Sequence, residues 1–381
     1  MAILGNNYDK LGYYLVGWKK FYNKTLALMY AQKYDFEVRW IFNDDVYGGI
    51  DWTIPVEESL ESLYSRRAKQ IRETYDYVIL YYSGGADSHN VLMSFIDNNL
   101  LIDEIVMELP ELDRKNFNDY DTSSRNVYGE IDFIAAPRLK ELQHKLSPTT
   151  KIRFTDFSKP VIELMRKDNW FEHAPTNAFL NLGQIGRQLL HTSDKSIIDL
   201  ANKSRKVCQL YGVDKPLVTY DGNDYYAYFA DSSAMHVNPV TPENNKEYDD
   251  YVSTEFFYWT ADFPEIVVKQ AQLIKLACTL DENKKQFWKK SMKLHVGEFR
   301  KIMHPIIYPG LEEPKFQATK PENNIVRPMD AWFWNTTDSK SQDNYLYAIK
   351  SYLNNNIDSK YFIQGQSDKG ISSINTRFYK L

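Results

Sequence analysis

A buried strand followed by a glycine turn constrains the fold of this chain more than any other segment. Residues 77–82 read Tyr-Val-Ile-Leu-Tyr-Tyr, a β-branched and aromatic run typical of a strand covered on both faces of a parallel sheet. Residues 83–88 read Ser-Gly-Gly-Ala-Asp-Ser, and glycines let the backbone turn sharply and let a ligand touch the main chain. Apolar residues then recur at helical spacing from Val91 to Ile96. We therefore expect a strand, a tight loop and a helix whose N-terminus, with its free N–H groups and positive dipole end, suits an anion.

The segment from Ser83 to Ser88 resembles the Ser-Gly-Gly-x-Asp-Ser signature of the PP-loop, or N-type, ATP pyrophosphatases, within the adenine nucleotide alpha hydrolase-like superfamily. That superfamily includes asparagine, GMP, NAD and argininosuccinate synthetases, tRNA thiolases, lysidine synthetases and phosphoadenylylsulfate reductases. The resemblance is specific around the motif and only architectural elsewhere. It implies an α/β fold with a parallel sheet of the HUP type. A Walker A loop is excluded, because no Gly-Lys-Ser or Gly-Lys-Thr follows the glycines.

The resemblance assigns ATP to this loop and gives roles to Ser83, Gly84, Gly85, Ala86, Asp87 and Ser88. Backbone N–H groups and the two serine hydroxyls would hold the β- and γ-phosphates. Asp87 would bind Mg²⁺, because a hard cation that bridges phosphates usually takes one or two carboxylates. Asp87 and Ser88 are accordingly the candidate catalytic residues. At the end of the next expected strand, Met107 and Glu108 would lie beside the adenine; the alternative is that they only end the strand.

The favoured function, on this resemblance, is ATP-dependent activation of an acceptor carboxylate or amide. AMP would be transferred to the acceptor with release of pyrophosphate, and a nitrogen nucleophile would then displace AMP, as in asparagine synthetase-like ligases. The acceptor would be a small molecule or a nucleic acid. The glutaminase domains of one class of relatives need an N-terminal cysteine, whereas Met1 is followed here by Ala2. We therefore expect a separate source of ammonia or amine.

Three alternatives to this function stay open. The first is adenylating modification of a nucleobase in RNA or DNA, and the second is a phosphoadenylylsulfate reductase-like protein. The third is a module that binds the nucleotide without cleaving it. The reductase branch typically uses a reactive cysteine, and neither Cys208 nor Cys278 has an activating sequence context. These two cysteines are expected to be buried free thiols, and two cannot build a Cys₄ zinc or iron–sulfur site.

Length and composition favour two or three structural units with a packed core, since 43% of the 381 residues are hydrophobic. We expect an N-terminal α+β appendage over 1–74, a PP-loop ATP-binding domain over 75–230 and a mainly helical unit over 231–381. The apolar runs are too short to span a membrane, and the start lacks the order of a signal peptide. A cytoplasmic protein without a membrane partner is therefore expected. A net charge of −5 gives no overall attraction to nucleic acid.

Local patterns predict the other elements. Helices are expected over 21–31, from Pro55, over 131–146, over 202–211 and from Pro264, and strands over 36–42, 102–109 and 150–156. Residues 217–229 allow two interpretations. The favoured one is a hairpin around Asp221-Gly222; the other is a fourth parallel strand followed by 221–224, which weakly resembles an acidic glycine segment of asparagine synthetases. Residues 113–125 are expected to form a long loop, the kind that often serves as a lid.

Three further residues are candidates for substrate contacts. Asp156 would project from the end of a strand, where open α/β sheets place ligand contacts. Arg187 could clamp a phosphate or a carboxylate, or form a surface ion pair. Asp221 depends on the fourth-strand interpretation. The lysine-rich stretch 284–293, which also holds Phe287 and Trp288, predicts either a solvated helix face or a surface for nucleic acid.

Overall fold

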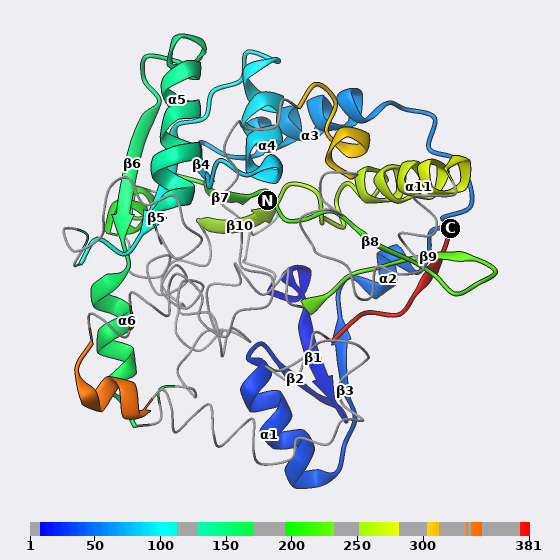
Figure 1. Cartoon of the computed structure of the whole chain (residues 1–381), viewed down its shortest axis with the longest axis horizontal. Coiled ribbons are helices and arrows are strands. Elements are labelled where there is room, and N and C mark those ends of the chain that lie inside the picture. Colours follow the sequence, from blue (N-terminus) through cyan, green and yellow to red (C-terminus); the bar gives the residue numbers. More distant parts are fainter. Residues whose placement is uncertain are drawn as a thin grey trace.

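A parallel sheet of five strands lies at the centre of the computed structural model (Figure 1). The structure describes residues 8–112, 114, 128–168, 170, 195–203, 205–231, 251–281, 303–311, 333, 337–344 and 374–381. The strands of this sheet are β4 (Tyr77–Tyr81), β5 (Glu104–Leu109), β6 (Lys151–Asp156), β7 (Val207–Tyr211) and β10 (Val252–Phe256). All neighbours are parallel, and the order across the sheet is β10-β7-β4-β5-β6. The predicted α/β class with a parallel sheet is confirmed.

The burial of each strand follows from its place in the sheet. All five residues of β4 are buried, as are all five of β7, since these strands have neighbours on both sides. Strand β6 forms one edge, and its residues alternate between exposed and half-buried. The run that was most apolar in the sequence, residues 77–82, therefore occupies the middle of the sheet, as its composition predicted.

Three helices lie side by side over one face of the sheet: α3 (Leu60–Thr74), α4 (Ala86–Ile96) and α11 (Glu265–Leu280) (Figure 1). Helix α11 begins directly after Pro264, as predicted. Helix α3 begins after Ser59, not at Pro55, because the Ser59 hydroxyl accepts a hydrogen bond from Ser62 N at 3.3 Å and caps the first turn. The predicted 131–146 helix is a π-helical turn (Ile131–Ala135), α5 (Ala136–Leu142) and a 3-10 turn (Gln143–Lys145). Helices α6 (Ser158–Met165) and α9 (Lys195–Ala201) are shorter.

The N-terminal part of the chain forms a small antiparallel sheet of its own. A 3-10 turn (Tyr8–Leu11) precedes β1 (Tyr13–Val16), β2 (Lys19–Phe21) and β3 (Val38–Ile41), which are ordered β2-β1-β3. Helix α1 (Lys24–Tyr34) connects β2 to β3 and contacts all three strands. The helix and strand predicted here are both confirmed. A short helix, α2 (Asp44–Tyr47), follows.

A third sheet joins the middle of the chain to its C-terminal end. Strands β8 (Leu217–Tyr220) and β9 (Tyr225–Tyr228) form an antiparallel hairpin, and β11 (Tyr379–Lys380) pairs with β9. The favoured hairpin interpretation of Asp221-Gly222 is thus confirmed. The fourth-strand interpretation is wrong, because β8 belongs to this sheet and not to the parallel one.

The fourth parallel strand is β7, a segment for which the sequence pattern predicted a helix. The helix predicted over 202–211 is wrong: α9 ends at Ala201, and the segment from Val207 forms a strand that pairs with β4 on one side and β10 on the other. Pairing on both edges outweighs the local helical pattern, since the strand is then buried throughout. Cys208 accordingly lies in a strand, whereas Cys278 lies in α11; both are buried free thiols, as expected.

Strand β10 had no predicted counterpart, and it carries the parallel sheet beyond residue 230. Among the described strands it pairs with β7 alone, about 40 residues earlier in the sequence. Glu255 of β10 also bonds to the buried Arg67 of α3, with Glu255 Oε2 and Arg67 Nη2 2.8 Å apart. A short window of sequence around β10 gives no information on these partners, because β7 and α3 lie elsewhere in the chain.

Several predicted features lie outside the described residues: the 113–125 loop apart from Arg114, the segment with Arg187, and the lysine-rich stretch 284–293. Among the helices that the structure does describe, none is both long enough and apolar enough to cross a membrane.

A buried ion pair links the N-terminal part of the chain to Asp231, which follows β9. Lys24 Nζ in α1 lies 2.7 Å from Asp231 Oδ2, with side-chain exposures of 2% and 0%. Tyr14 of β1 donates its hydroxyl to the same carboxylate at 2.8 Å, and Ile374 N donates to Asp231 Oδ1 at 2.9 Å. One carboxylate therefore joins the N-terminal sheet, helix α1 and the C-terminal segment at Ile374.

We predict that Asp231→Asn lowers the free energy of unfolding by about 3–5 kcal/mol, because it removes the charge nearest a buried ammonium while keeping the side chain's shape. The exposed Lys10–Asp262 pair provides a matched control, with exposures of 48% and 42%. Asp262→Asn should cost less than about 1 kcal/mol. Urea unfolding of the three proteins checks this, and equal costs for the two variants would contradict it.

Candidate functional site

The candidate site lies where the order of the parallel strands reverses. From β4 the chain adds β5 and then β6 on one side of the sheet, and it later adds β7 and then β10 on the other side of β4. The carboxyl ends of β4 and β7 are therefore adjacent, but the connections that follow them lead to opposite sides of the sheet. Open α/β sheets bind ligands in the crevice at this switch point, outside the carboxyl ends of the strands. Here those ends are followed by the loop 83–88 and by the segment 212–215.

The loop 83–88 turns in a way that only glycine allows. Gly84 has a φ of +75°, and a Cβ atom on it would lie 2.7 Å from Ala135 Cα and 2.8 Å from Ala135 N. Ala135 ends a π-helical turn, a feature often found at functional sites. From the following helix, Arg138 Nη1 donates to Gly84 O at 2.7 Å. A guanidinium group is thus held directly beside the loop.

The two serines of the loop bond weakly to the loop itself. Ser88 Oγ accepts from Ser83 N and donates to Gly85 O, both at 3.3 Å, and lies 3.4 Å from Ser83 Oγ. These distances are long for hydrogen bonds, so the hydroxyls can turn to a better acceptor at little cost. Gly85 is the N-cap of α4 and provides no side chain to cap the helix. Helix α4 therefore presents its first turn, and the positive end of its dipole, at the crevice.

The end of β7 approaches this loop as closely as the backbone permits. A Cβ atom on Gly212 would lie 2.9 Å from Asp87 C and 2.9 Å from Ser88 N. Any side chain there would push β7 away from the first turn of α4. The glycine thus allows Lys215, three residues on, to reach Asp87.

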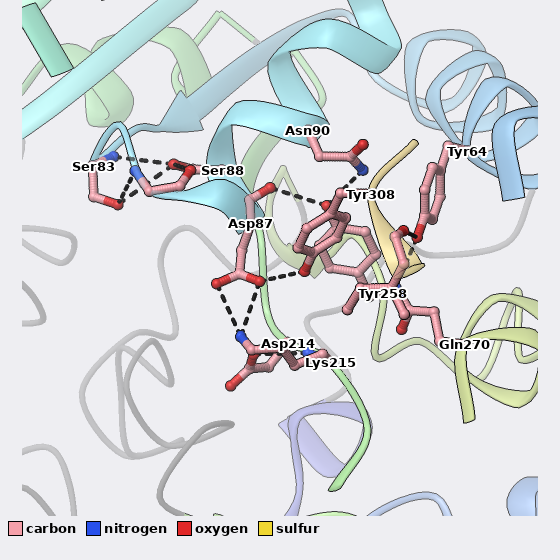
Figure 2. A network of polar contacts seen from close by, with 12 residues as sticks. Tyr64, Ser83, Asp87, Ser88, Asn90, Asp214, Lys215, Tyr258, Gln270 and Tyr308 are labelled. Atoms are coloured by element: carbon pink, nitrogen blue, oxygen red, sulfur yellow. Dashed lines mark hydrogen bonds and ion pairs between the residues drawn. The ribbon is translucent and has the colours of Figure 1, made fainter. Parts of the chain in front are cut away.

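Asp87 and Lys215 form the centre of the site (Figure 2). Lys215 Nζ lies 3.0 Å from Asp87 Oδ1 and 3.2 Å from Asp87 Oδ2, and it lies 2.8 Å from Asp214 Oδ1. Lys215 is only 7% exposed, whereas each carboxylate is about one-third exposed, at 31% for Asp87 and 28% for Asp214. One buried ammonium is therefore shared between two carboxylates that reach solvent.

Two tyrosines, Tyr258 and Tyr308, form hydrogen bonds to Asp87 (Figure 2). The Tyr308 hydroxyl donates a short hydrogen bond to Asp87 Oδ1, and the Tyr258 hydroxyl donates to Asp87 O at 3.0 Å. Asn90 Nδ2 in turn donates to the Tyr258 hydroxyl at 2.8 Å. Burial raises the pKa of Tyr308 well above its usual value, and the negative charge of Asp87 raises it further. Both hydroxyls consequently stay protonated and remain donors.

The same tyrosine network reaches two helices on the face of the sheet. Tyr64 of α3 accepts a hydrogen bond from Gln270 Nε2 of α11 at 2.8 Å and donates to Ile307 O at 2.5 Å. The rings of Tyr258 and Tyr308 lie 5.7 Å apart. The position of the Tyr308 hydroxyl thus depends on α3 and on α11, of which α11 is far from the loop in sequence.

A neutral histidine lies on the other side of the loop. His89 Nδ1 is 3.0 Å from the Tyr82 hydroxyl. Burial, and then the nearby positive charge of Arg138, lower the pKa of His89 to about 4. Burial raises the pKa of Tyr82, so this hydroxyl stays protonated and shares a hydrogen bond with the neutral imidazole.

The remaining predicted residues lie in different places. Met107 and Glu108 lie near the end of β5, just after Val106, whose carbonyl accepts from Tyr82 N at 2.9 Å. Met107 is buried and Glu108 half-buried. Asp156 does end β6, where its carboxylate accepts from Glu111 N at 2.9 Å and from Ser158 N at 2.8 Å. Asp221 lies at the hairpin tip and accepts from Asn223 N and Asp224 N within its own turn, which lowers its pKa. None of the contacts described for Asp221 reaches the loop.

Sequence reasoning missed Asp214, Lys215, Tyr258 and Tyr308. A signal existed for the first two, because an apolar run, a glycine and charged residues succeed one another at 207–215 much as they do at 77–87. Recognising β7 as a strand would have put them at the switch point. The segment 212–215, and not 221–224, therefore follows the fourth strand. The tyrosines belong to remote segments and carry no local signal.

The residues present fit a magnesium ion that is bound together with phosphates. The described residues contain no group of three or more histidine, cysteine or acidic side chains that could hold a metal alone. Asp87 and Asp214 both touch one ammonium, so they are close enough to share a cation. One or two carboxylates plus phosphate oxygens is the usual protein environment of Mg²⁺.

Comparison with known proteins finds no matching family model and no matching curated protein.

We predict that Gly84→Ala destabilises the protein more than Gly222→Ala does. Both glycines have positive φ, at +75° and +113°, but nothing lies within 4 Å of a Cβ on Gly222. Each alanine should cost about 1–3 kcal/mol through backbone strain. The contact with Ala135 should add about 1–3 kcal/mol for Gly84→Ala alone. Urea unfolding measures both, and equal losses would show that the close approach to Ala135 is not required.

We predict that His89 makes stability depend on pH. Its folded pKa of about 4 lies below the ordinary value of 6.5, so the unfolded chain takes up the proton first as pH falls. The stabilisation is present above pH 6.5 and is lost as the pH falls toward 4, by at most about 3 kcal/mol. Urea unfolding at these two pH values should show a smaller loss for His89→Gln. The exposed His144 provides the control, and His144→Gln should keep the wild-type loss.

Proposed function

We propose that this chain binds an adenine nucleotide at the ends of β4 and β7 and transfers AMP from ATP to an acceptor. The observation that carries the proposal is the meeting of the Ser-Gly-Gly-Ala-Asp-Ser loop with Asp214 and Lys215 at the switch point of the sheet. The strand order also supports a sheet of the adenine nucleotide alpha hydrolase-like type. We place the protein in the cytoplasm, acting on a small molecule or a nucleic acid, with ammonia or an amine from a separate source.

The chain's own groups suit the binding of phosphates. The uncapped first turn of α4 offers N–H groups, and the weakly bonded hydroxyls of Ser83 and Ser88 can donate to phosphate oxygens. Arg138 and Lys215 place positive charge on two sides of the loop. Of the two residues proposed to lie beside the adenine, Glu108 is half-buried and can contact the base, whereas Met107 is buried and can only support that end of β5.

The proposed reaction balances without a redox partner. An acceptor oxygen attacks the α-phosphorus of ATP, the bond from the α-phosphorus to the bridging oxygen breaks, and pyrophosphate leaves. A nitrogen nucleophile then displaces AMP from the activated acceptor. Mg²⁺, when bound by Asp87, supplies charge neutralisation for the leaving pyrophosphate. Lys215 and the N-terminus of α4 keep the phosphates in place, which orients the α-phosphorus toward the acceptor.

The buried thiols weigh against the reductase-like alternative. Burial raises the pKa of Cys208 well above its usual value, so the reactive thiolate is disfavoured. The second candidate function is a module that binds the nucleotide without cleaving it. This alternative is favoured because Asp87 already binds Lys215 and Tyr308 within the protein, so its carboxylate is not free for a metal ion. Modification of a nucleobase stays open as a choice of acceptor.

We predict that wild-type protein with Mg·ATP and the right acceptor pool forms AMP and pyrophosphate. Asp87→Asn should lower this rate about 100-fold or more, since it removes the charge that binds the metal. Asp97, which is exposed at the other end of α4, provides the control, and Asp97→Asn should behave as wild type. Radiolabelled ATP and chromatography of the products measure the rates.

The outcomes separate the two candidates. Nucleotide binding by the wild type without AMP in any pool would favour the binding module. Absence of any ATP binding, measured by calorimetry on folded protein, would contradict the assignment of this loop to a nucleotide.

A further inference from the structure

The ammonium group of Lys215 lies where a cation between Asp87 and Asp214 would lie. It contacts three oxygens of the two carboxylates, at 2.8, 3.0 and 3.2 Å. Asp214 is held in place independently, because Lys215 N also donates to Asp214 Oδ1 at 2.7 Å. Lysine is the flexible member of this group, with a four-carbon stem and a compact charge. The two carboxylates can therefore stay near each other while the ammonium moves.

We infer that Lys215 is an internal counter-ion that keeps divalent metal out of the site until a nucleotide arrives. This inference rests on the proposed nucleotide site and adds a specificity-determining residue to it. A bare divalent cation approaching Asp87 meets a buried positive charge at close range, and such repulsion is strong where the dielectric constant is low. The Tyr308 hydroxyl also points its proton at Asp87 Oδ1. Metal alone must displace both donors and gives the ammonium no new partner.

A nucleotide changes this balance. Its phosphates are anionic and enter next to the loop 83–88, which lies against the segment that carries Lys215. The ammonium can then exchange a carboxylate for a phosphate oxygen without losing a charged partner. Asp87 and Asp214 become available to the metal that accompanies the phosphates. Lys215 thus couples the two ligands, so that each favours binding of the other.

The inference makes two predictions of opposite sign for Lys215→Met, which keeps the length of the side chain and removes its charge. Binding of Mn²⁺ alone, without nucleotide, should tighten about tenfold or more, because the competing charge is gone. Binding of ATP in excess chelator should weaken about tenfold or more, because a phosphate partner is lost. A lysine with only a structural role would not strengthen either interaction.

The experiment uses the full chain and four proteins. Mn²⁺ binding is followed by the electron paramagnetic resonance signal of the free ion, and ATP binding by calorimetry in chelator. Lys215→Arg keeps the charge and should leave Mn²⁺ binding as weak as in the wild type. Lys203→Met, at an exposed lysine, should match the wild type in both measurements. Thermal unfolding shows that each variant is folded.

Each outcome decides the question. Unchanged or weaker Mn²⁺ binding by folded Lys215→Met would overturn the inference, and so would an equal gain of Mn²⁺ binding in Lys215→Arg. Failure of the proposed function looks different: no protein would bind ATP, while Lys215→Met would still gain Mn²⁺ binding. In that case Lys215 would remain an internal counter-ion at a metal site without a nucleotide.

Discussion

The contact between the carboxylate of Asp87 and the ammonium of Lys215 is the interaction on which the candidate site depends. It joins the loop after the first parallel strand to the segment after the fourth, at the only place in the sheet where these strand ends are neighbours. Two glycines make the contact possible. Gly84 lets the loop lie against Ala135, and Gly212 lets β7 end against the first turn of α4. The ion pair of Asp87 and Lys215 forms because the backbone segments that carry these residues already lie close together.

The rest of the chain supports this contact from a distance. Tyr308, in the C-terminal third of the chain, donates to Asp87. Its position depends on Tyr64 of α3, which bonds to the neighbouring Ile307 O and to Gln270 of α11. Tyr14 of the N-terminal sheet, Lys24 of α1 and Ile374 of the C-terminal segment meet around the buried carboxylate of Asp231. The buried ion pair of Asp231 and Lys24 keeps these segments together, because separating the two charged groups would leave an unpaired charge in an apolar interior. The loop is therefore local in sequence but its geometry is not.

Positive groups border the loop even though the whole chain is acidic. The net charge is −5, yet the loop is bordered by Arg138, by Lys215 and by a helix N-terminus. The histidine beside it is neutral, because burial and the guanidinium group together oppose its protonation. The carboxylates that face this positive surface are the groups a metal ion would need. Positive groups suited to phosphate and carboxylates suited to a cation thus lie side by side, which is the arrangement that the proposed nucleotide and metal would need.

The sequence by itself determined the local parts of this protein, and only the tertiary structure decided how they combine. The run 77–82 predicted a central buried strand because its residues are apolar on both faces, and the loop 83–88 predicted a helix N-terminus because glycines and small polar residues favour that turn. Asp221-Gly222 predicted a hairpin for the same local reason. Strands β7 and β10 escaped prediction, since each is stabilised by pairing with residues distant in the chain. Lys215 became part of the site by the same route: its role depends on parallel pairing that brings the end of β7 beside β4, and a short window of sequence holds no information on which strands become neighbours.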